Sequence, residues 1–180
     1  MATTPIQITE DISLTEYRAT DVPALVQYLN EIEIYNNTLN IPHPYTREVA
    51  DTWISLKEQQ TKEGGRPVSF VIRDEKEALI GGTGFENLQI GKTHKAELGY
   101  WLAKPYWNQG IMTRVVKGLC KFAFDEFGLI KITARTFSFN QRSSRVLEKC
   151  GFVREGFAKK HVKKRDQYLD VNLYALLKNT

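Results

Sequence analysis

Cysteine and histidine are scarce in this chain, whose 180 residues include two cysteines and three histidines. Two cysteines cannot form the set of bridges that staples a small secreted fold, and no Cys/His group has the spacing of zinc ligands. Cys120 and Cys150 both fall on the apolar side of predicted helices, where a free cysteine behaves as a small hydrophobe. The composition therefore argues against a disulfide scaffold and indicates no metal site.

Long hydrophobic runs are also lacking. The longest apolar stretches are much shorter than the roughly 20 residues that span a bilayer. The first residues, MATTPIQITEDISL, have neither the basic start nor the apolar core of a signal peptide. We therefore expect a soluble, cytoplasmic protein that does not enter a membrane. Its net charge of +4 is compatible with an anionic cofactor or an acidic partner, and falls short of a nucleic-acid-binding signature.

No repeat, low-complexity tract or linker-like stretch interrupts the sequence, so we expect a single domain over residues 1–180. Apolar residues alternate in some stretches and recur at helical spacing in others. The predicted strands are 12–17, 68–73, 79–85, 96–102, 130–135, 152–159 and 168–177, and the predicted helices begin near residues 21, 46, 111 and 140. This order predicts an α/β protein, a mixed sheet with helices on both faces.

The predicted hairpin over residues 68–85 has one regular strand and one that is rich in glycine. Its first strand alternates two sets of side chains, Val68, Phe70 and Ile72 with Ser69, Val71 and Arg73. Three glycines, Gly81, Gly82 and Gly84, lie inside its second strand, which suggests a bulge or a close approach of another backbone. Elsewhere, Tyr35–Tyr45 is rich in turn residues and predicts an ordered loop.

A short turn joins the predicted strand 96–102 to the next helix. It reads Trp107-Asn108-Gln109-Gly110-Ile111-Met112-Thr113. The first N–H groups of a helix have no acceptor within the helix and lie at the positive end of its dipole, so such a turn suits a pyrophosphate. A side chain at Gly110 would stand between the backbone and the phosphate oxygens. Spacing alone leaves open whether Gly110 is only punctuation, because the three-glycine and Gly-Lys-Ser/Thr signatures are absent.

Two longer segments resemble a known family. They are AELGYWLAKPYWNQGIMTRVVKGLCKFAF (residues 96–124) and NQRSSRVLEKCGFVREGF (residues 140–157). They resemble the GNAT superfamily of N-acetyltransferases, within it the branch that acetylates the N-termini of proteins, including ribosomal proteins. The family's diphosphate turn reads Gln/Arg-x-x-Gly-x-Gly/Ala; here Trp107 stands first, Gly110 holds the central place and Met112 the last. The branch usually has Trp-Gly-x-Gly, so Asn108 is a second departure.

The resemblance implies a fold, a cofactor and a set of roles. The fold is a mixed, mostly antiparallel sheet of six to seven strands with splayed middle strands and about four helices. The cofactor is acetyl-CoA, with the pantetheine arm on the backbone of Tyr100, Trp101 and Leu102 and the diphosphate on the N–H groups of Gln109, Gly110, Ile111, Met112 and Thr113. Asn140 and Ser143 contact the cofactor as well. Asn140 is also explained fully as a helix N-cap.

Acetyl transfer to an amine needs a base for the ammonium proton and a proton donor for the leaving thiolate. By resemblance, Glu155 is the candidate base and Ser143 the candidate donor, with Glu97 as a second candidate base. Each also has a simpler reading: Glu155 as an exposed charge on a strand, Ser143 as a hydroxyl in the first turn of a helix. Cys150 lies at a helix C-terminus, the wrong end for a low thiol pKa, so no acyl-enzyme is expected.

The sequence does not identify the acceptor amine or the partners. The first hypothesis is a protein N-terminus; the alternatives are a small amine such as a polyamine or an antibiotic, or a non-catalytic domain that senses coenzyme A. The run Lys159-Lys160-His161-Val162-Lys163-Lys164-Arg165 is typical of a solvated hairpin tip, or docks weakly to an acidic partner such as ribosomal RNA. The protein is expected to be a monomer or a homodimer.

Overall fold

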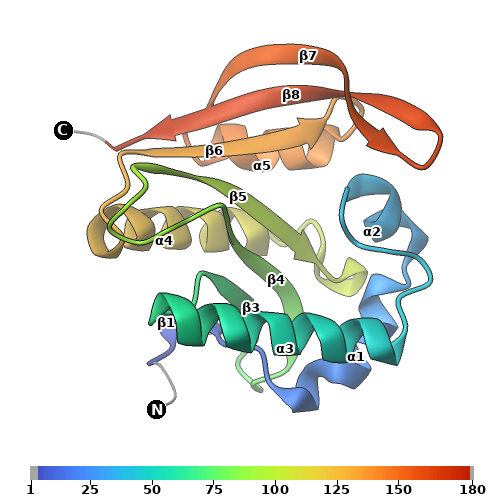
Figure 1. The fold of residues 1–180 in the computed structure, drawn as a ribbon, viewed down its shortest axis with the longest axis vertical. Coiled ribbons are helices and arrows are strands. Elements are labelled where there is room, and N and C mark those ends of the chain that lie inside the picture. The colour runs from blue at the N-terminus through green and yellow to red at the C-terminus, as the bar shows by residue number, and fades with distance from the viewer. Residues whose placement is uncertain (1–3, 179–180) are drawn as a thin grey trace. The chain divides into compact units, whose positions relative to one another are not determined.

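The computed structural model describes residues 4–178, which form two compact units (Figure 1). The first unit contains the chain up to Gly84 together with Tyr100–Ile111. The second contains Phe85–Gly99 and the chain from Met112 onward. The described residues include eight strands and five α-helices, against the six to seven strands and four helices expected. None of the helices in this range has both the length and the hydropathy needed to span a bilayer.

The first unit is built on antiparallel strands in the order β1-β2-β3-β4. The strands are β1 (Ile6–Thr9), β2 (Ile12–Thr15), β3 (Ser69–Arg73) and β4 (Leu79–Glu86), whose last two residues belong to the second unit. The helices are α1 (Val22–Leu29), α2 (Ile32–Asn37) and α3 (Arg47–Gly64), with 3-10 turns η1 (Ala19–Asp21) and η2 (Lys104–Tyr106). Sequence reasoning missed β1, and α2 occupies the start of what was expected to be a loop from Tyr35.

α3 begins where the sequence predicts it. The side chain of Thr46 accepts a hydrogen bond from the backbone N–H of Val49 at 3.4 Å, which satisfies one of the donors that a helix start leaves open. Helical spacing after Thr46 predicts that Ala50, Trp53 and Ile54 lie on the inner side of the helix. Ala50 and Ile54 are buried in the core of the first unit, whereas Trp53 is exposed. Its ring instead lies edge-on to Tyr17 and beneath the Nζ of Lys57.

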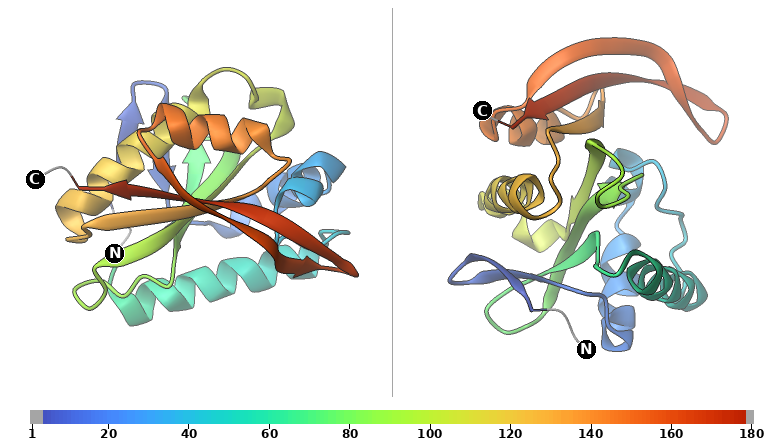
Figure 2. Two further views of the ribbon diagram at one scale, coloured as in Figure 1. Left: turned by 90° about the horizontal axis from the view of Figure 1, so that it is seen from above. Right: turned by 60° about the vertical axis from the view of Figure 1, so that its left-hand side comes forward.

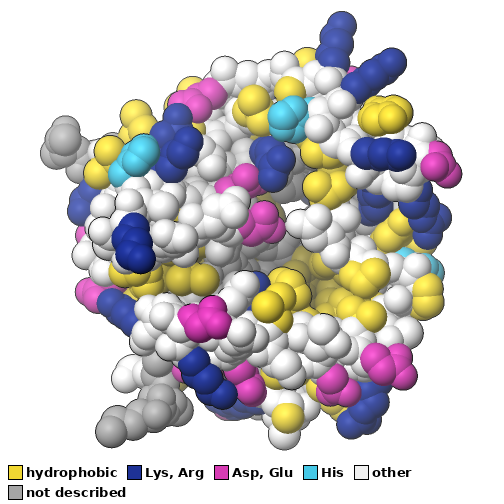
Figure 3. Space-filling view, viewed as in Figure 1, with side chains coloured by type: hydrophobic (Ala, Val, Ile, Leu, Met, Phe, Trp, Pro, Cys, Tyr) yellow, Lys and Arg dark blue, Asp and Glu magenta, His cyan; other side chains and the backbone are white. Residues whose placement is uncertain are grey.

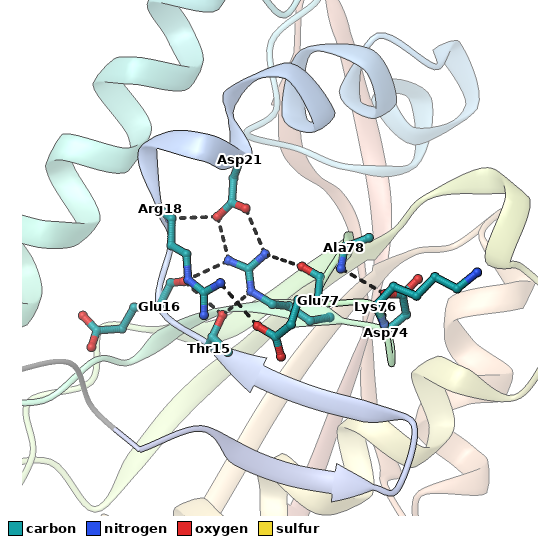
Figure 4. Close-up of polar contacts among 9 residues, drawn as sticks. Thr15, Glu16, Arg18, Asp21, Asp74, Lys76, Glu77 and Ala78 are labelled. Atoms are coloured by element: carbon teal, nitrogen blue, oxygen red, sulfur yellow. Dashed lines mark hydrogen bonds and ion pairs between the residues drawn. The ribbon is translucent and has the colours of Figure 1, made fainter.

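Arg73 is the unexpected member of the core of the first unit. Alternation along β3 would place it on the solvent side, yet Phe70, Val71, Ile72 and Arg73 are all buried, and Arg73 has an exposed fraction of 2%. Its Nη1 and Nη2 donate to the two carboxylate oxygens of Asp21, each at 2.9 Å, and its Nε donates to the hydroxyl of Thr15 at 2.6 Å (Figure 4). A buried charge is tolerated when it is paired and hydrogen-bonded in this way. The bridge ties β3 to the start of α1.

Two glycines of β4 let Trp101 approach the backbone of this strand closely. A side chain at Gly81 would place its Cβ 2.6 Å from the carbonyl oxygen of Trp101, and one at Gly82 would lie 2.5 Å from the indole nitrogen of the same residue. Real Cβ atoms essentially never approach another atom this closely. Both alternatives are present, because the pairing of β3 with β4 shifts register between the pairs Ile72–Gly81 and Arg73–Leu79. The close approach brings Trp101 against the backbone of β4.

The second unit contains the strand order β5-β6-β8-β7. The strands are β5 (Lys95–Leu102, its first five residues in this unit), β6 (Lys131–Phe137), β7 (Val153–Lys164) and β8 (Gln167–Leu177), and the helices are α4 (Ile111–Glu126) and α5 (Gln141–Lys149). β5 and β6 are parallel, and the other pairs are antiparallel. The expectation of a mixed, mostly antiparallel α/β fold is confirmed.

α5 covers one face of β6 and β8 (Figures 1 and 2). The hydroxyls of Thr136 on β6 and Ser144 on α5 are 3.0 Å apart and buried. The hydroxyl of Tyr174 on β8 donates to Glu148 of α5 at 3.0 Å, and burial raises the pKa of this tyrosine. The expected N-cap is present, because the Oδ1 of Asn140 accepts from the N–H of Ser143 at 3.1 Å.

The two cysteines are free, as expected. Cys120 is buried in α4, and desolvation raises the pKa of its thiol. Cys150 is half-buried at the end of α5, where burial also raises the pKa of its thiol. His161 belongs to the run that was expected to form a hairpin tip, and it lies within β7. Within residues 4–178, no three His, Cys, Asp or Glu side chains gather as metal ligands.

Candidate active site

The turn before α4 has the backbone geometry that an anion site needs. Asn108 and Gly110 both adopt left-handed conformations, with φ of 63° and 71°. Outside glycine, asparagine is among the residues that adopt this conformation most readily, so Asn108 can replace the glycine that related turns have there. Gly110 is exposed and is followed directly by Ile111, the first residue of the 16-residue helix α4. The turn thus presents the N–H groups of a long helix without a side chain at Gly110.

Side chains of the turn hold it in place. The indole nitrogen of Trp107 donates to the carbonyl of Leu102 at 2.7 Å, and the amide nitrogen of Gln109 donates to the carbonyl of Pro105 at 3.0 Å. Trp107 also packs against the apolar cluster of the first unit. Ile111 and Met112 are buried. Because the side chain of Met112 is turned inward, its departure from the family pattern leaves the backbone N–H groups of the turn unchanged.

Tyr100, Trp101 and Leu102 form the end of β5, in the first unit. Tyr100 and Trp101 are half-buried, and Leu102 is buried with its carbonyl already accepting from Trp107. Trp101 packs against the same apolar cluster as Trp107. The next residue, Ala103, donates its N–H to the carbonyl of Ile80 on β4 at 2.8 Å. This end of β5 is therefore fixed to β4.

The ladder between β5 and β6 is short. It joins Lys95, Ala96 and Glu97 to Lys131, Ile132 and Thr133, which are the first three residues of each strand. β6 continues to Phe137 paired with β8. In the described part of the second unit, Glu97 is thus the last residue of β5 that pairs with β6. A short ladder of this kind agrees with the splay that the resemblance implies.

Both candidate bases are paired to cations on one face of β6. The Nζ of Lys131 lies 2.8 Å from each carboxylate oxygen of Glu155, and the Nε of Arg135 lies 2.6 Å from Glu97. Lys131 and Arg135 are four residues apart on a strand, so their side chains share a face. Glu155 occupies a bulge of β7, between Arg154 and Gly156 in the pairing with β8. Sequence reasoning proposed the two carboxylates and missed both cations, which are brought to them by strand pairing alone.

The two pairs differ in exposure. The side chain of Glu155 is 47% exposed and that of Glu97 is 24% exposed. An exposed pair contributes about 0–1 kcal/mol, so Glu155 can leave Lys131 at little cost. Ser143 lies in the first turn of α5, where its N–H is already satisfied by Asn140.

Comparison with known proteins assigns these features to a family. The family described as "Acetyltransferase (GNAT) domain" matches residues 11–153, which is more than half of the chain. The chain belongs to the GNAT acetyltransferases. Acetyl-CoA is the acetyl donor of this family, and the left-handed turn before α4 fits its diphosphate. The expectation of an N-acetyltransferase that uses acetyl-CoA is confirmed at the level of the family.

The relatives of this GNAT protein include enzymes that act on ribosomal proteins. The ribosomal-protein-serine acetyltransferase of Escherichia coli (strain K12) is 28% identical over 176 residues, 96% of each chain. The N-acetyltransferase YoaA of Bacillus subtilis (strain 168) is 35% identical over 106 residues, so that alignment spans 59% of each protein. Among solved structures, the chain is similar to RimL, a ribosomal L7/L12 α-N-protein acetyltransferase in complex with coenzyme A. The superposition has a TM-score of 0.86 at 21% sequence identity and covers 97% of this chain and 98% of RimL. This likeness shows the fold.

Proposed function

We propose that this GNAT protein transfers the acetyl group of acetyl-CoA to the α-amine of a protein N-terminus, with a ribosomal protein as the class of acceptor. The observation that carries the proposal is the alignment with the ribosomal-protein-serine acetyltransferase, which spans 96% of both chains at 28% identity. Such an alignment includes residues Tyr35–Tyr45, which we expect to shape the acceptor pocket.

The charges beside the candidate bases support an acceptor with a single amine. Glu97 and Glu155 are balanced by Arg135 and Lys131, so these four residues carry no net charge. A polycation such as a polyamine would be held best by an excess of carboxylates, because only unbalanced negative charge attracts it over a distance. A peptide N-terminus brings one ammonium group and depends on backbone and side-chain contacts for the rest of its affinity.

The donor binds through backbone groups. The N–H groups of the turn from Gln109 to Thr113 hold the diphosphate, and the backbone of Tyr100, Trp101 and Leu102 holds the pantetheine arm. The amide of Asn140 contacts the arm while its oxygen caps α5, since the amide nitrogen is a separate donor. The expected effect is to fix the thioester carbonyl beside the acceptor amine in a ternary complex.

Proton transfer is assigned to two side chains. Glu155 takes the proton of the ammonium group, directly or through one water, after exchanging Lys131 for the acceptor. The neutral amine attacks the thioester carbonyl, its nitrogen releases a second proton to solvent, and the carbon–sulfur bond breaks as the tetrahedral intermediate collapses. Glu155 returns its proton to solvent after the amide has formed. Ser143 gives its hydroxyl proton to the leaving thiolate and regains one from solvent. Glu97 is the second candidate base, and its pairing with Arg135 and lower exposure make it the less accessible of the two.

The acceptor is tested with peptides and mass spectrometry. The purified protein and acetyl-CoA are incubated with a peptide that has a free N-terminal serine or alanine and an internal lysine. A matched peptide with a blocked N-terminus, and spermidine, serve as controls. Acetylation of the α-amine alone is the expected result. Acetylation of lysine or spermidine, with the free N-terminus untouched, would contradict the proposal, and cofactor binding with no acetyl transfer to any of them would favour the sensor hypothesis.

A further inference from the structure

The β7–β8 hairpin of the second unit carries a strongly basic surface. Residues 153–177 include six basic and three acidic side chains, a net charge of +3 in a chain whose net charge is +4. Lys and Arg side chains gather over this hairpin in Figure 3, with apolar side chains between them. The charge of the molecule is therefore concentrated on one element.

A bulge in β7 displays part of this charge. Ala158 pairs with Val171 and Val162 with Leu169, so residues 159–161 stand opposite the single residue Asp170. Lys160 adopts a left-handed conformation with φ of 48°, and its N–H donates to the carboxylate of Asp170 at 2.7 Å. All three side chains of the bulge, Lys159, Lys160 and His161, are exposed. Such bulges re-aim side chains, and this one is held by a specific hydrogen bond.

Two exposed aromatic rings flank the bulge on the same face of the hairpin. Tyr168 and Asn172 lie on the face of β8 that also carries Asp170, and Phe157 pairs with Asn172. Phe157 is 44% exposed and Tyr168 is 60% exposed. Four residues along a strand separate the two rings by about 13 Å. Each ring has a cation beside it. The Cζ of Arg154 lies 5.5 Å from the ring centre of Phe157, and the Nζ of Lys163 lies 5.9 Å from the ring centre of Tyr168.

We propose that this face of the β7–β8 hairpin binds single-stranded RNA. Phosphates lie against Lys159, Lys160 and Lys163, and bases stack on Tyr168 and Phe157. Proteins that bind single strands without sequence preference combine a basic track with aromatic rings in this way. An acidic protein would use the cations and leave the exposed rings without a role. The proposal goes beyond acetyl transfer and does not depend on it.

The lysines and the bulge of β7 also suit a second role, the protection of a sheet edge. β7 is the last strand in the order of its sheet, and lysines and bulges protect such an edge from pairing with another chain. A protective role predicts that removing the lysines promotes self-association and leaves nucleic-acid binding unaffected. An RNA-binding role predicts the reverse. The two roles are therefore separable by experiment.

The test is fluorescence anisotropy with a labelled single-stranded RNA of about 12 nucleotides, within the range of known site sizes. With three phosphate contacts, the slope of log K against log salt is about −2, so affinity falls roughly 20-fold between about 50 and 200 mM salt. The triple variant Lys159→Gln, Lys160→Gln, Lys163→Gln should bind at least about tenfold more weakly at low salt, with a slope shallower by about 2. The control removes the same charge at exposed lysines elsewhere: Lys62→Gln, Lys76→Gln, Lys92→Gln.

Stacking is tested separately. Tyr168→Ala should weaken RNA binding by about 5- to 150-fold and leave the salt slope unchanged. A labelled acidic peptide gives the competing arm: if it binds as tightly as RNA and Tyr168→Ala has no effect on either, the surface serves an acidic protein and the proposal is wrong. Equal losses in the two triple variants, or self-association of the hairpin variant with unchanged RNA binding, would also overturn it. These measurements contain no acetyl-CoA, so they are independent of the proposed enzyme function.

Discussion

Replacing Gly110 by aspartate perturbs the predicted diphosphate site directly. The substitution adds a carboxylate among the N–H groups of the turn and a Cβ at a residue whose φ is 71°. In the unaltered protein, acetyl-CoA at about 100 times its Kd should add about 2.7 kcal/mol of stability. For a chain of this length each kcal/mol raises Tm by roughly 2–4 °C, so the expected shift is about 5–11 °C. In Gly110→Asp it should fall to about 1 °C or less, because the new charge repels the diphosphate.

Gly128 offers a matched control at the other end of α4. Its φ is 68°, so Gly128→Asp introduces the same side chain under similar backbone strain. That variant should keep the full acetyl-CoA shift in a thermal-shift titration, with ATP and NADH as inactive ligands. Without ligand, Gly128→Asp should melt at the lower temperature of the two, because a carboxylate is favourable at a helix N-terminus and unfavourable at its C-terminus. A full acetyl-CoA shift in Gly110→Asp would refute the assignment of the turn.

Three further perturbations test other parts of the argument. Asp21→Ala leaves the guanidinium of Arg73 buried without its partner and should lower the free energy of unfolding by about 3–5 kcal/mol, measured in urea; a loss below about 1 kcal/mol would contradict the buried bridge. Glu155→Gln should lower kcat by about 10²- to 10⁴-fold with the KM for acetyl-CoA unchanged, and a larger loss in Glu97→Gln would transfer the base role to Glu97. Burial raises the pKa of Tyr45 to about 12. Between about pH 10 and pH 12 the folded protein keeps a proton on Tyr45 that the unfolded chain releases. The contribution to stability is therefore full below about pH 10 and is lost as the pH rises towards 12. The urea midpoint of Tyr45→Phe should fall less over this range than that of the unaltered protein.

Local signals predicted the elements whose ends are fixed by their own residues. Thr46 and Asn140 cap α3 and α5 as expected, because an N-cap side chain bonds to an N–H only three residues away. α4 ends beside Gly128, whose φ is positive as a helix stop requires. Asn108 serves where related turns have glycine because asparagine adopts the left-handed conformation readily. Such features can be read from a sequence because cause and effect lie within one turn.

Features that depend on distant partners were missed. β7 continues to Lys164, past the expected end at Lys159. The added segment is charged and has little strand propensity of its own, and pairing with β8 keeps it extended. Arg73 is buried because Asp21 and Thr15 satisfy it from segments more than fifty residues away. For the same reason, the cations beside Glu97 and Glu155 could not be inferred from the sequence. The roles of these carboxylates remain predictions that kinetics can check.

The division of the chain between its two units has a consequence for synthesis on the ribosome. Domains are generally completed in the order in which their residues emerge. Here the first unit needs Tyr100–Ile111, which follow fifteen residues (Phe85–Gly99) of the second. Trp101 and Trp107, which pack against the apolar cluster around α1 and α3, belong to that late segment. The N-terminal unit therefore cannot close its core until the chain has passed Trp107, so truncation at Gly84 should yield a fragment with an open core.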